Sequence, residues 1–326
     1  MKFLIKYILP VIMVFGFTKG YAQQTMQFSE YMFNGMAVNP AYAGYKEDWT
    51  LNLSGRLQWT GVDGAPKTST LSVDGVTDGY KKNVGIGFLV TNDRLGPENN
   101  SAAYINYAYR IRLDAADTKR LCFGIAAGGI EYTINGSLFN AADITDGSIQ
   151  SGAQSNFTPD FRAGAYYYSP FFYMGASVLN LLPQTNLNPN SAIVPQVRTL
   201  YVTTGFMVPI SPAISWKPAV MFKEDFKGPT NMDVSSFFLI GKVLWLGAAY
   251  SSSVTLWNKP NLQSDLNKND AFTGMIDISV NSRIRVGYAY DIVTSQLPGF
   301  QNGSHEVSIS IGFGRRNGRI LSPRYF

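Results

Sequence analysis

The chain has 326 residues, of which 15% are charged and 14% aromatic, and its formal net charge is +5. No apolar stretch reaches the ~18 residues that a membrane-spanning helix needs, which excludes a helical membrane protein. Cys122 is the single cysteine and His305 the single histidine. This composition predicts no disulfide framework, no metal site and no cofactor.

The first 22 residues have the pattern of a secretory signal peptide. Lys2 and Lys6 precede an apolar run at residues 7–17, and residues 20–22 read G-Y-A, with small residues where signal peptidase cuts. Cleavage after residue 22 removes three of the 27 basic residues, which leaves 24 against 22 acidic ones and a net charge of +2. So small a net positive charge gives no reason to expect nucleic acid as a partner.

Residues 27–44 precede the first predicted strand and read Q-F-S-E-Y-M-F-N-G-M-A-V-N-P-A-Y-A-G. This sequence is too apolar for a segment that hangs free in water. We therefore expect residues 23–47 to form a plug-like segment that packs in or under the lumen of the barrel described below.

Residues 49–60 read W-T-L-N-L-S-G-R-L-Q-W-T. The odd positions are apolar or glycine, the even positions are polar, and a tryptophan stands near each end. Because successive side chains of a strand point to opposite faces, one face is apolar and the other polar. About ten residues between two indoles fit a tilted transmembrane strand with an aromatic girdle at each interface. Taken alone, the segment also fits a soluble sandwich, although strands there usually have about 5–6 residues.

Similar alternation recurs along the chain. It predicts about 14 strands, which begin near Trp49, Thr68, Val84, Ala102, Leu121, Asp160, Phe171, Thr199, Ala213, Met232, Val243, Ala271, Arg283 and Glu306. The links that follow even-numbered strands are short, as at residues 77–83 and 114–119. Those that follow odd-numbered strands are mostly long, as at residues 131–159, 180–198 and 251–270.

This sorting of loop lengths is typical of an outer-membrane barrel, with short periplasmic turns and long external loops. The sequence therefore predicts an all-β protein: one transmembrane antiparallel β-barrel at residues 23–326, surrounded by outer-membrane lipid. An even strand count places both termini in the periplasm. Residues 314–326 extend beyond the last alternating position and are expected to form a periplasmic tail that folds back against the N-terminal segment.

Several charged residues are candidates for the polar lumen or for binding a partner: Arg110, Arg112, Arg162, Arg283, Arg285, Asp291 and His305. They could bind an acidic segment of a partner inside the barrel. Alternatively, the arginines could pair with Asp160, Asp277 and Asp291 to fill a polar lumen, which is the more common arrangement.

Five short motifs are unusual for a simple pore. They are Y-M-F-N…N-P-A-Y-A-G before the first strand, D-G-A-P-K-T at residues 63–68, N-D-R-L-G-P at residues 92–97, G-S-H-E at residues 303–306 and S-P-R-Y-F at the C-terminus. The structural candidates within them are Asn39, Pro40, Asp63, Gly64, Arg94, Ser322, Pro323, Arg324, Tyr325 and Phe326.

Together these motifs resemble the PorP/SprF family of the type IX secretion system in Bacteroidetes, along the whole mature chain. Gly35-Met36 departs from the proline and apolar residue expected after Y-M-F-N. The resemblance implies a non-catalytic outer-membrane barrel that serves protein secretion and gliding motility. The implied partners are secretion components or a large exported adhesin, which carries a C-terminal secretion domain.

Two other functions remain open at this point. The first is a channel for a small solute, for example an apolar nutrient, which would need an apolar path, whereas the predicted inward face is charged and hydroxylated. A hydrolase would pair His305 with a serine and an acid, but Ser304 and Glu306 are its strand neighbours and point to the opposite face.

Overall fold

The computed structural model describes residues 34–77, 81–138, 152–182, 196–257, 259, 269–294 and 301–313. The expected signal peptide (residues 1–22), residues 23–33 and the tail (residues 314–326) lie outside the described residues. The tail includes the candidates Ser322, Pro323, Arg324, Tyr325 and Phe326.

The described residues form one sheet with three short 3₁₀ turns, η1 (Gly35–Ala37), η2 (Pro40–Tyr42) and η3 (Gly136–Leu138). The strands are β1 (Trp49–Leu57), β2 (Lys67–Val76), β3 (Val84–Leu95), β4 (Glu98–Arg112), β5 (Arg120–Asn135), β6 (Ala153–Tyr168), β7 (Phe172–Leu179), β8 (Thr199–Phe206), β9 (Val208–Ser211), β10 (Ile214–Glu224), β11 (Thr230–Ile240), β12 (Leu244–Val254), β13 (Asn269–Ser279), β14 (Ile284–Val293) and β15 (Ser304–Phe313). Among these residues, no helix is both long and apolar enough to cross a membrane.

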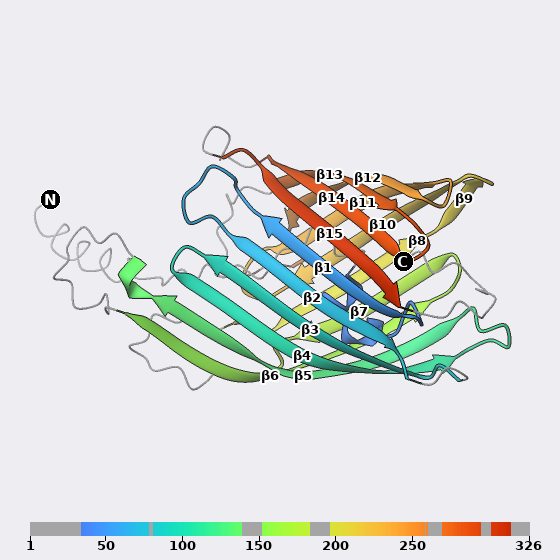
Figure 1. Cartoon of the computed structure of the whole chain (residues 1–326), viewed down its shortest axis with the longest axis horizontal. Helices are drawn as coiled ribbons and strands as arrows, with labels where there is room; N and C mark the ends of the chain where they lie inside the picture. The colour runs from blue at the N-terminus through green and yellow to red at the C-terminus, as the bar shows by residue number, and fades with distance from the viewer. Residues whose placement is uncertain are drawn as a thin grey trace, which may run out of the picture.

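The sheet closes on itself. Each strand pairs antiparallel with its neighbours, and β1 pairs with β15 from Trp49 opposite Phe313 to Leu57 opposite His305. Strands β8 and β9 are separated by Met207 alone and both pair with β10, so together they fill one place in the wall. The described chain is therefore a closed 14-stranded barrel, as the sequence predicts, with steeply tilted strands and β1 beside β15 (Figure 1).

The two faces of the wall differ in polarity, and β4 shows this most clearly. The outward side chain of Ile105 is 64% exposed, and the outward Tyr107 and Tyr109 are also exposed. The inward Asn106 and Arg110 are at most 1% exposed. A wall that is apolar outside and carries buried polar groups inside is typical of a barrel surrounded by lipid.

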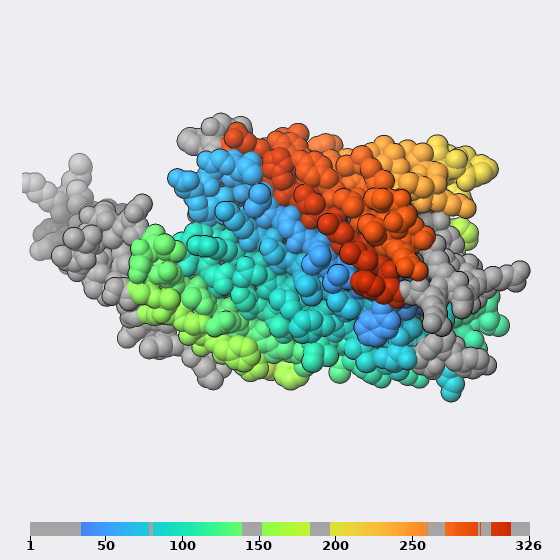
Figure 2. All heavy atoms as spheres, in the orientation of Figure 1, coloured from blue at the N-terminus to red at the C-terminus, as the bar shows by residue number. Residues whose placement is uncertain are grey.

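The space-filling view shows the outer surface where the first strands (blue) lie beside the last strands (red) (Figure 2). The exposed outward residues of β1, β14 and β15 include Leu53 on β1, Val286 and Tyr288 on β14, and Val307 and Ile309 on β15. In water such a surface would favour association. In a membrane it is the surface that the lipid chains cover.

The wall is not equally high around the barrel. Strands β5 and β6 have 16 residues each, whereas β7 and β8 have 8 each, and β5 and β6 extend beyond their neighbours in Figure 1. The predicted loop at residues 131–159 is therefore wrong at both ends, since β5 continues to Asn135 and β6 begins at Ala153. In the extended part of β5 the outward residues Glu131, Thr133 and Asn135 are polar, so the alternation that reveals a strand is lost there.

Candidate functional site

The N-terminal segment that precedes β1 lies inside the barrel. From Asn34 to Asp48 the chain makes the turns η1 and η2 and then enters β1. Most of its apolar side chains are buried, including Met36, Ala41 and Tyr45. Turn η2 contacts β4, β5 and β6. The described part of the expected plug thus packs in the lumen, and we refer to residues 34–48 as the plug.

Asn39 and Pro40 fix the start of η2. The Asn39 side chain accepts a hydrogen bond from the amide of Ala41 at 2.9 Å, as an N-cap residue does, and Pro40 occupies the first position of the turn. The Asn39 amide nitrogen also donates to the carbonyl of Ala165 on β6 at 3.0 Å. One side chain therefore shapes the plug and attaches it to the wall.

Two glycines in the wall allow the plug backbone to approach closely. A Cβ added to Gly124 on β5 would lie 2.2 Å from the amide nitrogen of Ala41, and one added to Gly85 on β3 would lie 2.0 Å from the carbonyl oxygen of Ala43. Both distances are below any real Cβ contact. The wall is therefore shaped to receive the plug backbone at these strands.

Polar contacts tie the plug to the opposite part of the wall as well. The Lys46 ammonium lies 3.4 Å from the Asn52 side-chain oxygen on β1 and 3.4 Å from the Ser310 hydroxyl on β15. The pKa of Lys46 is lowered to about 7, mainly by burial and in part by the nearby Arg285 guanidinium. Plug contacts therefore span the seam where the first and last strands meet.

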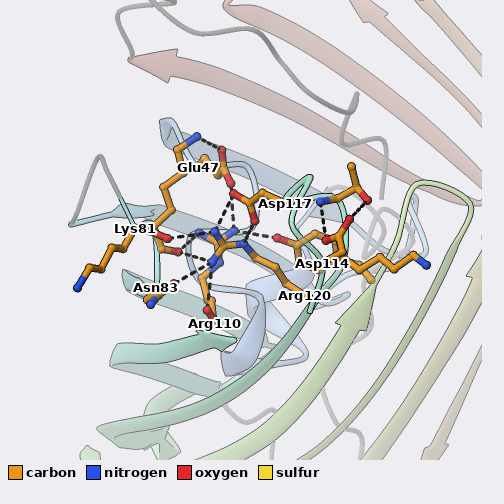
Figure 3. A network of polar contacts seen from close by, with 11 residues as sticks. Glu47, Lys81, Asn83, Arg110, Asp114, Asp117 and Arg120 are labelled. Atoms are coloured by element: carbon orange, nitrogen blue, oxygen red, sulfur yellow. Dashed lines mark hydrogen bonds and ion pairs between the residues drawn. The ribbon is translucent and has the colours of Figure 1, made fainter. Parts of the chain in front are cut away.

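The plug ends in an ionic network with two adjacent turns of the wall (Figure 3). Glu47 binds Lys82, in the β2–β3 turn, at 2.7 Å and approaches Arg110 of β4 at 3.7 Å. Arg120 of β5 binds Asp117, in the β4–β5 turn, at 2.6 Å, and donates to the Lys82 carbonyl at 2.9 Å. Arg110 and Arg120 are both fully buried. Their charges are balanced by two carboxylates and by carbonyl oxygens, as buried cations require.

A second ionic cluster lies at the barrel seam. Arg56 on β1 contacts Asp291 on β14 at 2.6 Å and Glu306 on β15 at 3.3 Å. All three side chains are more than nine-tenths buried. The cluster joins three neighbouring strands across the point where the sheet closes.

Two further candidates pair within the lumen. Arg162 lies 3.9 Å from Asp160 on the same strand, and its guanidinium sits 3.4 Å from the centre of the Tyr104 ring. Arg285 lies 3.3 Å from Asp277 on the neighbouring strand. These pairs follow the arrangement in which the arginines fill a polar lumen.

Three candidates are not enclosed within the lumen, contrary to the expectation. Arg112 is exposed at the very end of β4, and Arg283 is exposed in the turn before β14. His305 lies on the outward face of β15, where its Nδ1 is 2.8 Å from the Tyr288 hydroxyl. His305 points outward because strand side chains alternate between the two faces, and its neighbours Ser304 and Glu306 occupy the inward positions and are buried.

The remaining described candidates lie at the end of the barrel opposite the plug network. Asp63 and Gly64 are exposed in the β1–β2 loop, and Arg94 is exposed near the end of β3. None of them reaches the lumen residues described above.

The inward face is also less uniformly polar than expected. Phe237, Leu239 and Trp245 are buried inside the wall of β11 and β12. The buried ammonium of Lys217 lies 5.7 Å from the Trp245 ring and 5.7 Å from the Tyr173 ring. In the described part of the chain, no group of three or more His, Cys, Asp or Glu side chains could hold a metal ion.

Sequence reasoning did not select Glu47, Arg56, Arg120 or Glu306 as site residues. The alternation does place Arg56 and Glu306 on the polar face, so a search for charges at inward positions would have found them. Arg120 is the first residue of its strand and Glu47 precedes the first strand. Neither residue therefore lies within an alternating stretch that would assign its side chain to the polar face.

Comparison with known families shows that the type IX secretion system membrane protein PorP/SprF family matches residues 20–311. No curated protein matches the chain. Among solved structures, the Acinetobacter baumannii outer membrane protein Omp33 is 10% identical with a TM-score of 0.45, covering 82% of this chain and 99% of that one. The CymD monoaromatic hydrocarbon channel is 10% identical with a TM-score of 0.49, covering 86% and 93%. A Pseudomonas aeruginosa FadL homologue is 10% identical with a TM-score of 0.47, covering 87% and 94%. These likenesses are too distant to support an argument about function.

Proposed function

Because the chain belongs to the PorP/SprF family of type IX secretion system membrane proteins, we propose that it is a non-catalytic outer-membrane component of that system. In this role it supports the secretion or the surface anchoring of a large adhesin, and gliding motility. Its partners are other secretion components or the exported adhesin itself, through the C-terminal secretion domain of the adhesin.

The observation that carries this proposal is the family match, which extends over almost the entire barrel and its plug. The geometry supports it. The plug is attached to the wall at Asn39, Lys46 and Glu47, and the lumen arginines pair with carboxylates of the same barrel. An interior held in this way suits a rigid docking platform.

The proposal includes an orientation. We propose that the chain is exported with residues 1–22 as its signal, and that the short turns and both termini lie in the periplasm. The ionic network of Glu47, Arg110 and Arg120 then lies at the periplasmic rim, close to where periplasmic components of a secretion machine would dock.

Cysteine labelling tests the orientation. The buried Cys122 is first replaced by alanine, and cysteine is then placed at Asp63 in the β1–β2 loop or at Ala116 in the β4–β5 turn, both of which are exposed. A membrane-impermeant maleimide should label Asp63→Cys on intact cells, and Ala116→Cys only after the outer membrane is breached. Surface labelling at position 116 would show that the barrel is inverted.

Gene deletion tests the function. We expect the mutant to lose gliding and the surface display of a large adhesin, while uptake of small solutes stays unchanged. Immunoblots of surface, periplasmic and secreted fractions would measure the first effect, and solute uptake assays the second. Restoration by the wild-type gene on a plasmid is the control.

If the deletion mutant had normal surface proteins but impaired uptake of one nutrient, the result would favour the alternative function, an outer-membrane channel for a small solute. Recovery of secretion components with the solubilised barrel, identified by mass spectrometry, would identify the partner.

A further inference from the structure

Two of the sequence motifs meet at the end of the barrel opposite the plug network. The D-G-A-P-K-T motif enters β2, and the N-D-R-L-G-P motif ends β3. The amide of Gly96 donates to the carbonyl of Gly64 at 2.8 Å, and both glycines have positive φ angles, of +54° and +75°. The Thr68 hydroxyl donates to Asp93 at 2.6 Å on the inward face. The two loops are thereby fixed relative to each other.

This arrangement places two cations side by side on the outside of the barrel. Lys67 on β2 is directly opposite Arg94 on β3, and both side chains are exposed on the outward face. Side chains directly opposite each other on antiparallel strands are about 5 Å apart at Cβ, where like charges destabilise the sheet. No described residue forms an ion pair or a side-chain hydrogen bond with either of them. An anion between the two cations would relieve this repulsion.

The pair lies just beyond the apolar belt. The outward residues Leu71 and Val90 are opposite each other in the belt, the next outward pair is Ser69 with Asn92, and the one after that is Lys67 with Arg94. The boundary of the apolar belt falls between Leu71 and Ser69, so Lys67 lies about 7–13 Å beyond it along the strand. At a strand tilt near 40° this is about 5–10 Å along the membrane normal, which is the level of the headgroup layer, since that layer adds about 5–8 Å on each side of the hydrocarbon core.

The surroundings of the pair are suited to a polar headgroup. On the next strand, Asn99 is opposite Arg94, and Ser101 lies two residues away on the same face. On the other side, Leu57 separates Lys67 from His305, whose ring packs against Tyr290 with ring centres 5.0 Å apart. A tyrosine at this level is typical of the aromatic girdle that marks a membrane interface.

We propose that Lys67 and Arg94 form a binding site for the phosphate of an anionic glycolipid in the outer leaflet. Arginine presents paired N–H donors that match phosphate oxygens, and lysine adds a point charge. Clustered basic residues at a membrane surface recognise anionic headgroups in this way. The assignment to the outer leaflet rests on the orientation proposed above. The binding of a phosphate by the two cations does not depend on that orientation.

The test uses the full barrel purified in a non-ionic detergent, with lipid A that carries its phosphates as the probe. Native mass spectrometry during a titration measures the apparent Kd. Binding to the Lys67→Gln/Arg94→Gln variant should be at least about tenfold weaker, as expected when charge-assisted hydrogen bonds are lost. Lipid A stripped of its phosphates should bind the wild-type barrel as weakly as the intact lipid binds the variant. Because both residues are exposed, the variant should keep the heat-modifiable gel migration of a folded barrel.

The matched control is the Arg112→Gln/Lys119→Gln variant, which removes the same charge from exposed residues at the other end of the wall. It should bind phosphorylated lipid A like the wild-type barrel. Equal losses in the two variants would overturn the proposal, as would equal binding of the two forms of lipid A. Full competition by millimolar inorganic phosphate would also overturn it, since the site would then take the free ion rather than a lipid. If gene deletion caused no secretion defect, the proposed function would fail, but this binding result would still stand.

Discussion

Replacement of Arg56 by methionine should lower the free energy of unfolding of the barrel by about 3–5 kcal/mol, the usual cost of breaking a buried ion pair. Arg56 contacts Asp291 at 2.6 Å and Glu306 at 3.3 Å, and both carboxylates are buried. Without the guanidinium, two buried negative charges face each other across neighbouring strands at the seam. Urea titration of the barrel refolded in lipid vesicles would measure the loss.

The matched control removes the uncompensated charges. In the triple variant Arg56→Met/Asp291→Asn/Glu306→Gln, the buried carboxylates are replaced by neutral amides of similar shape, so most of the lost stability should return. An Arg56→Met barrel as stable as the wild type would show that the seam does not depend on this cluster. If the triple variant were no more stable than Arg56→Met, the loss would come from packing rather than charge.

Replacement of Leu53 by arginine should destabilise the barrel by about 2–4 kcal/mol, the cost of a cation at the lipid face near the membrane midplane. Leu53 lies near the middle of β1 with its side chain outward, opposite Ile309 on β15 and Leu71 on β2. The same urea titration in vesicles measures the effect, and unfolded protein in the membrane fraction should increase.

The neighbouring residue gives the control for Leu53. Ser54 faces the lumen between Ser308 and Thr70 and is only partly buried. Arginine at position 54 can reach polar groups, so its effect should be much smaller. Equal effects at positions 53 and 54 would mean that β1 is shifted by one residue, because such a shift exchanges the two faces.

The strands were predictable because alternation is a local property. The expected starts near Trp49, Val84 and Thr199 coincide with β1, β3 and β8. The prediction failed at the first residues of β6, which begins at Ala153, because Pro159 argues against a strand in a sequence pattern and the outward residues Ala153, Ser155 and Phe157 are not uniformly apolar. Local patterns report the environment of a strand, and they disappear where that environment changes.

The candidate site was only partly predictable, since alternation gives the face of a residue but not its partner. It placed Arg110, Arg162 and Arg285 inward, and they are inward. At strand ends the rule gives no direction, so Arg112 and Arg283 were assigned to the lumen although the wall no longer encloses them there.

The sequence by itself determined that this chain forms an antiparallel barrel and carries an apolar segment before its first strand, because both depend on composition or on a period of two. Only the tertiary structure decided which charges meet. Glu47 reaches Lys82 and Arg110, and Arg56 reaches Glu306, because closing the sheet brings distant strands together. Such pairs depend on register and on barrel closure, which no local pattern encodes.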